Sequence, residues 1–422
     1  MNPLLISGFG TSINVEKRKL VISNKLKNKK LEFYPHQIDH DSIIVDGHTG
    51  SITFESMRWL MKHDINLTLL NWNGNLLGIT LPQEPKAGKL RIKQYEKYLN
   101  SESRFEIALK IVQSKTANSV NLLKELATFY DEIDLNSVNK LVENERKNYQ
   151  FLFNQVQNKQ VTTRKESISN SFNKLMNYEG RIALVYLEQL RKIFVKLSPE
   201  FNFQGRMNKS NSWNNNASDE INALLNYGYA ILESEIRKCI NSIGLDPAIG
   251  FLHEVAPSKS PLVYDLQELF RWIIDLSVIQ LLEENKLKKS DFILTENYHI
   301  RLKENTAKLL IDKIRINFNN KVSYKNKKNY AYQSILFDNI QKLANFILEK
   351  DDKLIEFYVP RIIINKNDSL ELRNKILDMT IEERKRLGIG KTTYWYMKKN
   401  LQDGKRIKIY DKVLSKLNPD KI

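Results

Sequence analysis

The pattern of this chain changes near residue 83, where short strand-like segments give way to long amphipathic runs. Before that point, turn pairs such as Asp46-Gly47 and Asn73-Gly74 separate segments rich in β-branched and aromatic residues, namely KLVISN, KLEFYP, SIIVDG, NLTLLNW and LLGITLP. Apolar residues at helical spacing predict one helix from Phe54 to Lys62, and Asn73-Gly74 predicts a hairpin. Residues 1–83 are therefore expected to form a small N-terminal domain similar to a β-sandwich.

Residues 88–350 show apolar side chains at spacings of three and four, with few glycines or prolines. This pattern predicts a large all-α domain, assigned to residues 84–360, and the chain as a whole is expected to be of the α+β class. The helical pattern is interrupted by QGRMNKSNSWNNNASD at residues 204–219, which predicts a polar loop. Because the whole chain carries a formal net charge of +17, Arg206 and Lys209 in this loop are candidates for binding a DNA backbone, although a plain surface connection is an equal alternative.

Composition narrows the class of partner. The chain has 422 residues and a formal net charge of +17, which favours a polyanion such as nucleic acid. It contains no apolar run of about 18 residues, and its first residues do not form a signal peptide pattern. The single cysteine, Cys239, excludes an internal disulfide and a thiolate zinc site. We therefore expect a cytoplasmic protein that does not span a membrane.

A candidate metal site lies between residues 244 and 275. His253 stands just ahead of a predicted helix in which Asp265, Glu268 and Asp275 would share one face. Imidazole and carboxylate ligands with room for water and phosphate oxygens suit Mn²⁺ or Mg²⁺. The alternatives are a histidine held by a local hydrogen bond and, for Asp275, a salt-bridged surface position.

The last zone, residues 361–422, predicts a helix-turn-helix. Thr380 and Glu383 form a capping-box pair, Gly388 permits a turn, and a second helix is expected from Lys391 to Asn400. Its first residues, Lys391, Thr392 and Thr393, are candidates for contacts with DNA bases and phosphates. The alternative is a terminal helical pair that only packs on the main domain.

The residues also carry a resemblance. The run NALLNYGYAILESEIRKCINSIGLDPAIGFLHE at residues 222–254, LVYDLQELFRWIID after it and NYEGRIALVYLEQL upstream resemble motifs of the CRISPR-associated protein 1 family. The resemblance extends from residue 1 to about residue 350. It implies a metal-dependent DNA endonuclease and integrase with Glu179, His253 and Glu268 as catalytic metal ligands and Asp265 in a supporting catalytic role. Many members of the family have aspartate at the position of Glu268.

The added C-terminal segment is similar to the transposon-encoded branch of this family, the casposases. That branch joins donor 3′-hydroxyl ends to target DNA, recognises terminal inverted repeats and acts without a partner protein. The alternatives are a CRISPR adaptation integrase that uses a small CRISPR-associated partner protein, a catalytically inactive DNA-binding relative, and a metal-dependent RNA nuclease. The resemblance also implies a homodimer joined through the β domain, and staggered joining could require a tetramer on DNA.

Overall fold

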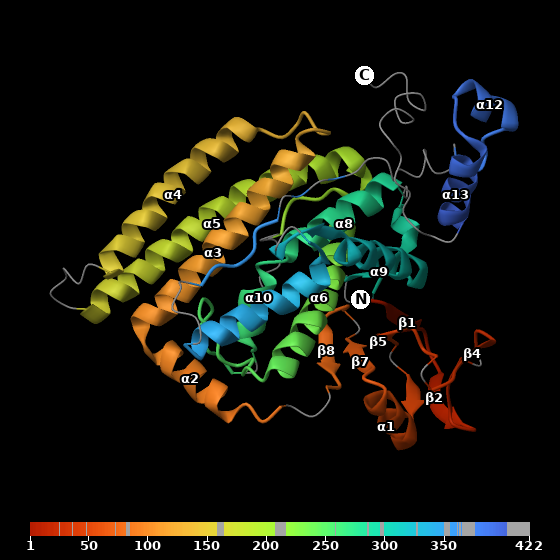
Figure 1. The fold of residues 1–422 in the computed structure, drawn as a ribbon, viewed down its shortest axis with the longest axis horizontal. Helices are drawn as coiled ribbons and strands as arrows, with labels where there is room; N and C mark the ends of the chain where they lie inside the picture. The colour runs from red at the N-terminus through yellow and green to blue at the C-terminus, as the bar shows by residue number, and fades with distance from the viewer. Residues whose placement is uncertain are drawn as a thin grey trace. The chain divides into compact units, whose positions relative to one another are not determined.

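The structure analysed is a computed structural model that describes residues 1–402 with gaps at residues 25, 36, 48, 72, 82–84, 158–163, 207–216, 258, 285–286, 296–298, 326–327, 350–354, 361, 363 and 365–375. The chain divides into two compact units, Met1–Arg361 and Ile362–Ile422. Within the first unit, strands come first and helices follow (Figure 1). This order confirms the predicted α+β class, whereas the predicted three-domain division remains a prediction.

Two four-stranded sheets form the N-terminal part (Figure 1). The first has the order β1-β5-β7-β8 and consists of β1 (Pro3–Ser7), β5 (Ser42–Asp46), β7 (Asn66–Leu70) and β8 (Leu76–Ile79). The second has the order β4-β3-β2-β6 and consists of β4 (Lys29–Phe33), β3 (Lys19–Asn24), β2 (Thr11–Glu16) and β6 (Gly50–Ile52). Strands β1, β5 and β7 pair in parallel, as do β2 and β6, so both sheets contain pairings between strands distant in sequence.

One apolar core joins the two sheets. Ile13 of β2 and Leu20 of β3 are buried in the same cluster as Ile43 of β5 and Leu60 of α1 (Phe54–Lys62). Full burial of such side chains stabilises a fold by roughly 1.5 to 3 kcal/mol each, which explains why these segments form a sandwich. The bounds of α1 confirm the predicted helix.

The turn between β7 and β8 confirms the predicted hairpin. The Asn71 amide donates to the carbonyl of Asn75 at 2.7 Å, and Gly74 has a φ of +81°. A left-handed backbone of this kind favours glycine because a Cβ atom would be strained there. The Asn-Gly pair therefore determines where the two strands reverse.

Helices make up most of the remainder of the first unit. Three of them, α3 (Ser101–Leu126), α4 (Leu135–Gln157) and α5 (Arg164–Leu197), lie side by side (Figure 1). A second group of helices packs around α6 (Glu220–Ile243) and consists of α7 (Pro261–Gln267), α8 (Arg271–Glu284), α9 (Glu304–Asn319) and α10 (Tyr332–Ile347). Helix α2 (Gly88–Leu99) leads into α3. Among the described residues, no helix is long and apolar enough to span a bilayer.

Short elements between these helices were not predicted. They are the 3₁₀ helices η1 (Pro199–Phe201) and η2 (Lys289–Asp291) and the two-stranded sheets formed by β9 (Phe292–Leu294) with β10 (Ile300–Leu302) and by β11 (Lys321–Ser323) with β12 (Asn329–Ala331). Each of these strands has only three residues, too few for an alternating pattern to be recognised in the sequence.

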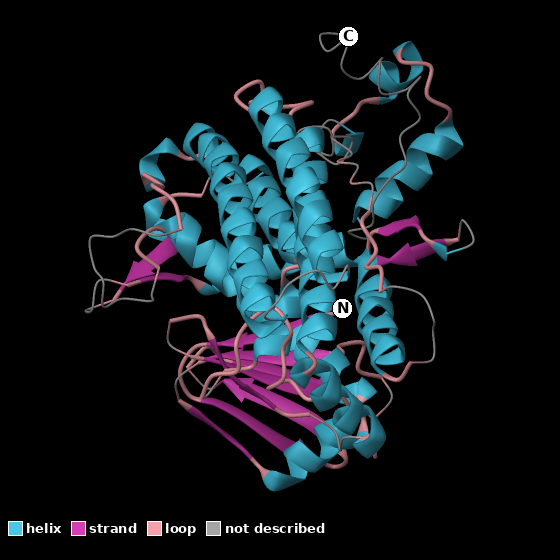
Figure 2. Ribbon diagram, turned by 90° about the vertical axis from the view of Figure 1, so that its left-hand side faces the viewer, coloured by secondary structure: helices cyan, strands magenta, loops and turns pink. Residues whose placement is uncertain are grey.

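A buried ion pair joins the sheets to the helices, which meet at one end of the helical region (Figure 2). Asp46 at the end of β5 accepts a hydrogen bond from Arg301 of β10 at 3.0 Å and lies 3.5 Å from the hydroxyl of Tyr227 on α6. Nearby, the hydroxyls of Thr68 and Ser234 hydrogen-bond at 2.8 Å between β7 and α6. Polar groups at this depth need partners, so these contacts orient the β sheets on the helices.

Replacing Asp46 by asparagine should destabilise the first unit. The substitution removes the anionic partner of Arg301 in a buried setting, and we expect a loss of about 2 to 4 kcal/mol in the free energy of unfolding. Urea unfolding followed by circular dichroism measures this difference. Asp312→Asn, in an exposed pair with Arg315, is the control and should leave the unfolding midpoint nearly unchanged.

The second unit contains the predicted helix-turn-helix, in α12 (Ile381–Arg386) and α13 (Lys391–Gln402). The Thr380 hydroxyl accepts from the Glu383 amide at 3.2 Å, and the Glu383 carboxylate accepts from the Thr380 amide at 3.0 Å, which confirms the capping box. Gly388 has a φ of +63° between the helices. A small core unites the pair, formed by Ile376, Met379, Ile389 and Met397.

Candidate active site

A buried carboxylate fixes the position of His253. Asp265 on α7 is fully buried and accepts hydrogen bonds from the amides of Phe251, Leu252 and His253 at 2.5, 3.0 and 3.0 Å. It also pairs with His253 Nδ1 at 2.7 Å. This hydrogen bond to Asp265 raises the pKa of His253 above its usual value. A histidine held through Nδ1 presents Nε2 to a ligand, so Asp265 acts by positioning His253.

Replacing Asp265 by asparagine should loosen this loop. One oxygen becomes an amide donor that faces backbone N–H donors, and we expect the free energy of unfolding to fall by about 2 to 4 kcal/mol. Urea unfolding measures the loss, with the exposed Asp131→Asn as the matched control. An unfolding midpoint equal to that of the control would show that these hydrogen bonds do not stabilise the loop.

The prediction that Asp265, Glu268 and Asp275 share one helical face is wrong. Helix α7 ends at Gln267 and α8 begins at Arg271, because the amides of Leu269 and Phe270 bond to carbonyls three residues back. This tighter turn rotates the later residues relative to Asp265. Asp265 consequently faces the 251–253 loop, whereas Glu268 and Asp275 line a cavity.

Lys115 joins two of the predicted ligands. Its ammonium nitrogen lies 2.5 Å from Glu179 Oε1 on α5 and 2.6 Å from Glu268 Oε2. All three side chains are largely buried, with exposed fractions of 21%, 17% and 7% for Lys115, Glu179 and Glu268. The structure thus brings two carboxylates from distant helices to one cation.

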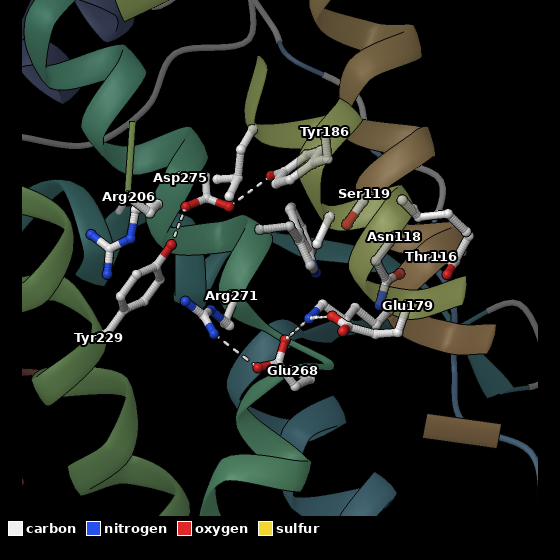
Figure 3. A pocket seen from close by; sticks show the side chains of 15 residues that line it. Thr116, Asn118, Ser119, Glu179, Tyr186, Arg206, Tyr229, Glu268, Arg271 and Asp275 are labelled. Atoms are coloured by element: carbon white, nitrogen blue, oxygen red, sulfur yellow. Dashed lines mark hydrogen bonds and ion pairs between the residues drawn. The ribbon is translucent and has the colours of Figure 1, made fainter. Parts of the chain in front are cut away.

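A second cation holds the other oxygen of Glu268. Arg271 donates to Glu268 Oε1 at 2.8 Å (Figure 3). Burial alone would raise the pKa of Glu268, but Arg271 and Lys115 together lower it to about 2. Glu268 is therefore ionised at neutral pH. Its Oε2 atom is buried and forms an ion pair with Lys115 at 2.6 Å that lacks the geometry of a regular hydrogen bond.

Two tyrosines hold Asp275 at the other end of the cavity (Figure 3). The hydroxyls of Tyr186 and Tyr229 donate to its two oxygens at 2.6 and 2.5 Å. Burial raises the pKa of Asp275 above its usual range. The ring of Tyr229 lies 4.4 Å from the guanidinium of Arg271, a cation–π contact that links this group to Glu268.

These side chains surround a cavity of about 320 Å³ between α3, α5, α6 and α8 (Figure 3). Its charged lining balances three cations against three carboxylates, namely Lys115, Arg206, Arg271, Glu179, Glu268 and Asp275. Cavities of this size with a few convergent polar groups are the usual form of ligand sites. The cavity is therefore the candidate active site.

Glu179 and Glu268 are carboxylates, the type of ligand that Mn²⁺ and Mg²⁺ prefer. Glu179 and Glu268 already share one cation, and the ionised Oε2 of Glu268, which has no regular hydrogen bond, is available as a ligand if Lys115 withdraws. His253 is not part of that pair: among the described residues, no three His, Cys, Asp or Glu side chains lie close enough to hold a metal ion. The structure thus brings together two of the three predicted ligands, Glu179 and Glu268, but not His253.

The remaining predicted residues fall into three groups. Arg206 lines the cavity, where it donates to the side chains of Asn222 and Asn226 at 2.9 Å each. Lys209 lies outside the described residues. Lys391, Thr392 and Thr393 are exposed in the first turn of α13.

Lys115, Arg271, Tyr186 and Tyr229 were not predicted. For Lys115 the sequence does contain a signal, which is the polar run SKTANS at residues 114–119. In the structure, the buried side of α3 is otherwise apolar, and four residues of this run are buried, namely Ser114, Thr116, Asn118 and Ser119. Buried polar residues on a long helix indicate a site. The tyrosines carry no such signal, since aromatic residues at helical spacing usually form the core.

Comparison with known proteins identifies the family. Residues 4–315 match the family model of CRISPR associated protein Cas1. The chain therefore belongs to the Cas1 family, and the resemblance seen in its motifs is confirmed. CRISPR-associated endonuclease Cas1 1 of Archaeoglobus fulgidus is 26% identical over 345 residues, covering 82% of this chain and 96% of that protein.

Two solved structures relate the fold to that family. A casposase bound to integration product is 34% identical to this chain, with a TM-score of 0.73, and the match covers 90% of this chain and 99% of that one. A CAS1 protein from Thermotoga maritima is 18% identical, with a TM-score of 0.62 over 82% of this chain and 97% of that one, and so shares the fold.

Proposed function

We propose that this protein is a metal-dependent DNA integrase and endonuclease of the casposase type, which joins donor 3′-hydroxyl ends to target DNA. The observation that carries the proposal is the convergence of Glu179 and Glu268 on one cation beside the cavity. The 34% identity to a casposase bound to integration product supports the choice of branch. Double-stranded DNA, as donor ends and target, is the proposed substrate.

In this proposal, Glu179 and Glu268 would hold Mn²⁺ or Mg²⁺, and His253, which lies outside that pair, would have to approach it to complete the ligand set. The ion, when bound, would stabilise negative charge on the phosphoryl oxygens and the leaving oxygen. Arg271 keeps Glu268 ionised and fixed, Asp265 presents His253, and the Tyr186–Asp275–Tyr229 group supports Arg271 through the Tyr229 ring. In strand transfer the donor 3′-oxygen forms a new bond to the target phosphorus and the target 3′-oxygen leaves, whereas attack by water gives a nick.

Substitution of the proposed ligands should abolish this chemistry. We expect Glu179→Gln, His253→Ala and Glu268→Gln each to lower strand transfer about 100-fold or more, because the ligands act mainly in the transition state. A labelled duplex with a free 3′-hydroxyl, a supercoiled plasmid and the purified protein with Mn²⁺ or Mg²⁺ make up the assay. DNA binding, measured by fluorescence anisotropy without divalent metal, should remain within a few-fold of wild type.

Glu188→Gln is the matched control for Glu179→Gln, because Glu188 lies on the same helix but is exposed and paired with Arg191. It should retain full transfer activity. Wild-type activity in the Glu179 and Glu268 variants would contradict the proposed site.

The second unit is proposed to recognise the donor ends. Lys391, Thr392 and Thr393 are exposed in the first turn of α13, the part of a recognition helix that meets base edges and phosphates. A helix of this kind fits the major groove of B-DNA, whereas the deep major groove of RNA excludes it. An exposed helix that fits this groove favours duplex DNA over RNA as the substrate.

Replacing Lys391, Thr392 and Thr393 together by alanine should therefore reduce sequence preference. We expect wild-type protein to enrich particular sequences from a random duplex library and the triple variant to enrich them about tenfold less, while plasmid nicking stays near wild type. Replacing the exposed Glu382 of α12 by alanine is the control. Equal enrichment by both variants would show that the exposed turn does not read sequence.

A CRISPR adaptation integrase is the alternative, supported by relatives such as CRISPR-associated endonuclease Cas1 1 of Archaeoglobus fulgidus. Transfer by the protein alone would favour a casposase. Nicking alone, with transfer only after a small CRISPR-associated partner and a repeat-bearing target are added, would favour adaptation. In both cases we propose a homodimer joined through the β domain, with a tetramer on DNA where two staggered ends are joined.

A further inference from the structure

We infer that the ammonium group of Lys115, which bridges Glu179 and Glu268, competes with the divalent ion for these two carboxylates. The inference rests on the proposed function, because it takes both glutamates as metal ligands. Lys115 would then be a positioning residue that sets how readily the site accepts metal.

The geometry leaves no room for both cations. The Lys115 nitrogen lies 2.5 Å from Glu179 Oε1 and 2.6 Å from Glu268 Oε2. A divalent ion such as Mg²⁺ binds carboxylate oxygens at about 2.0 to 2.1 Å, so an ion shared by these two oxygens would take nearly the same position as the nitrogen. The ammonium group must withdraw before such an ion can bind.

The two oxygens of Glu268 have different roles. Arg271 donates to Oε1 in regular geometry, whereas Oε2 lies beside Lys115 without a regular hydrogen bond. The Arg271 side chain is also held against the ring of Tyr229. Arg271 is therefore the fixed partner of Glu268 and Lys115 the exchangeable one.

Lys115 can leave without a change in the backbone. Its long side chain has several rotatable bonds, and 21% of it is exposed, so the ammonium group has access to solvent. Without this ammonium, two largely buried carboxylates would lie close together with only Arg271 to offset their charge, which is costly. Lys115 thus stabilises the pair of carboxylates at the cost of weaker metal binding.

The withdrawn ammonium group would also need a new anionic partner. A DNA phosphodiester bound at the cavity provides one, because ammonium groups bind phosphate oxygens well. DNA should therefore raise the affinity of the protein for metal, and metal should raise its affinity for DNA by the same factor. This coupling depends on the charge of Lys115.

Isothermal titration of the full-length protein with Mn²⁺ tests the inference without reference to activity. We expect Lys115→Met to bind Mn²⁺ about tenfold or more tightly than wild type, since the competing charge is gone. Lys115→Arg keeps the charge and should bind no more tightly than wild type. Lys124→Met, an exposed lysine on the same helix, is the control and should match wild type.

Thermal unfolding gives a second measurement in case Lys115→Met is poorly folded without metal. In EDTA this variant should unfold at a lower temperature than wild type, and its gain on adding Mn²⁺ should exceed that of wild type. A Mn²⁺ affinity and a Mn²⁺-induced gain equal to or smaller than those of wild type would overturn the inference.

The titration also separates this inference from the proposed function. If wild type binds Mn²⁺ and Glu268→Gln does not, the metal site stands, and an unchanged affinity in Lys115→Met overturns the role of Lys115 alone. If neither wild type nor Lys115→Met binds Mn²⁺, both the metal site and the inference are wrong.

Discussion

The site depends on one buried, ionised carboxylate, that of Glu268. A carboxylate with 7% of its side chain exposed is costly unless cations compensate it, and here Lys115 and Arg271 lie on its two oxygens. These cations come from α3 and from the start of α8, and Lys115 in turn contacts Glu179 of α5. The packing of helices distant in sequence is therefore coupled to the ionisation of a single side chain.

The break between α7 and α8 makes this arrangement possible. In one continuous helix, Asp265 and Glu268 would lie over one another, three residues apart on one face. The tight turn at residues 268–270 instead lets Asp265 bind the 251–253 loop while Glu268 points into the cavity. One acidic segment thus supplies both the proposed ligand Glu268 and the residue that orients a neighbouring histidine. The residues at this break, Glu268-Leu269-Phe270, include no glycine or proline, so nothing in the sequence indicates that the helix ends there.

Local features of the fold could be predicted from the sequence. The Asn73-Gly74 hairpin, helix Phe54–Lys62 and the Thr380–Glu383 capping box each depend on residues close together in the chain, and the structure contains all three. The parallel pairings of β1 with β5 and β2 with β6 depend on contacts between distant segments, which no local pattern specifies. Glu179 was found through a family resemblance, and Glu268 both through that resemblance and from the acidic residues that follow His253. Lys115, 64 residues from Glu179, was not, since only the packing of α3 on α5 brings it there.

The charge balance of the cavity bears on the proposed binding of metal and DNA. Three cations face three carboxylates around the cavity, so a divalent ion added to this set would leave an excess of positive charge. Excess charge in a partly buried site is unfavourable unless an anion enters or a cation leaves. A phosphodiester supplies the anion, and Lys115 is the cation with both the contacts and the exposure to leave. On the proposed function, each of the two ligands, metal and DNA, should therefore raise the affinity of the protein for the other.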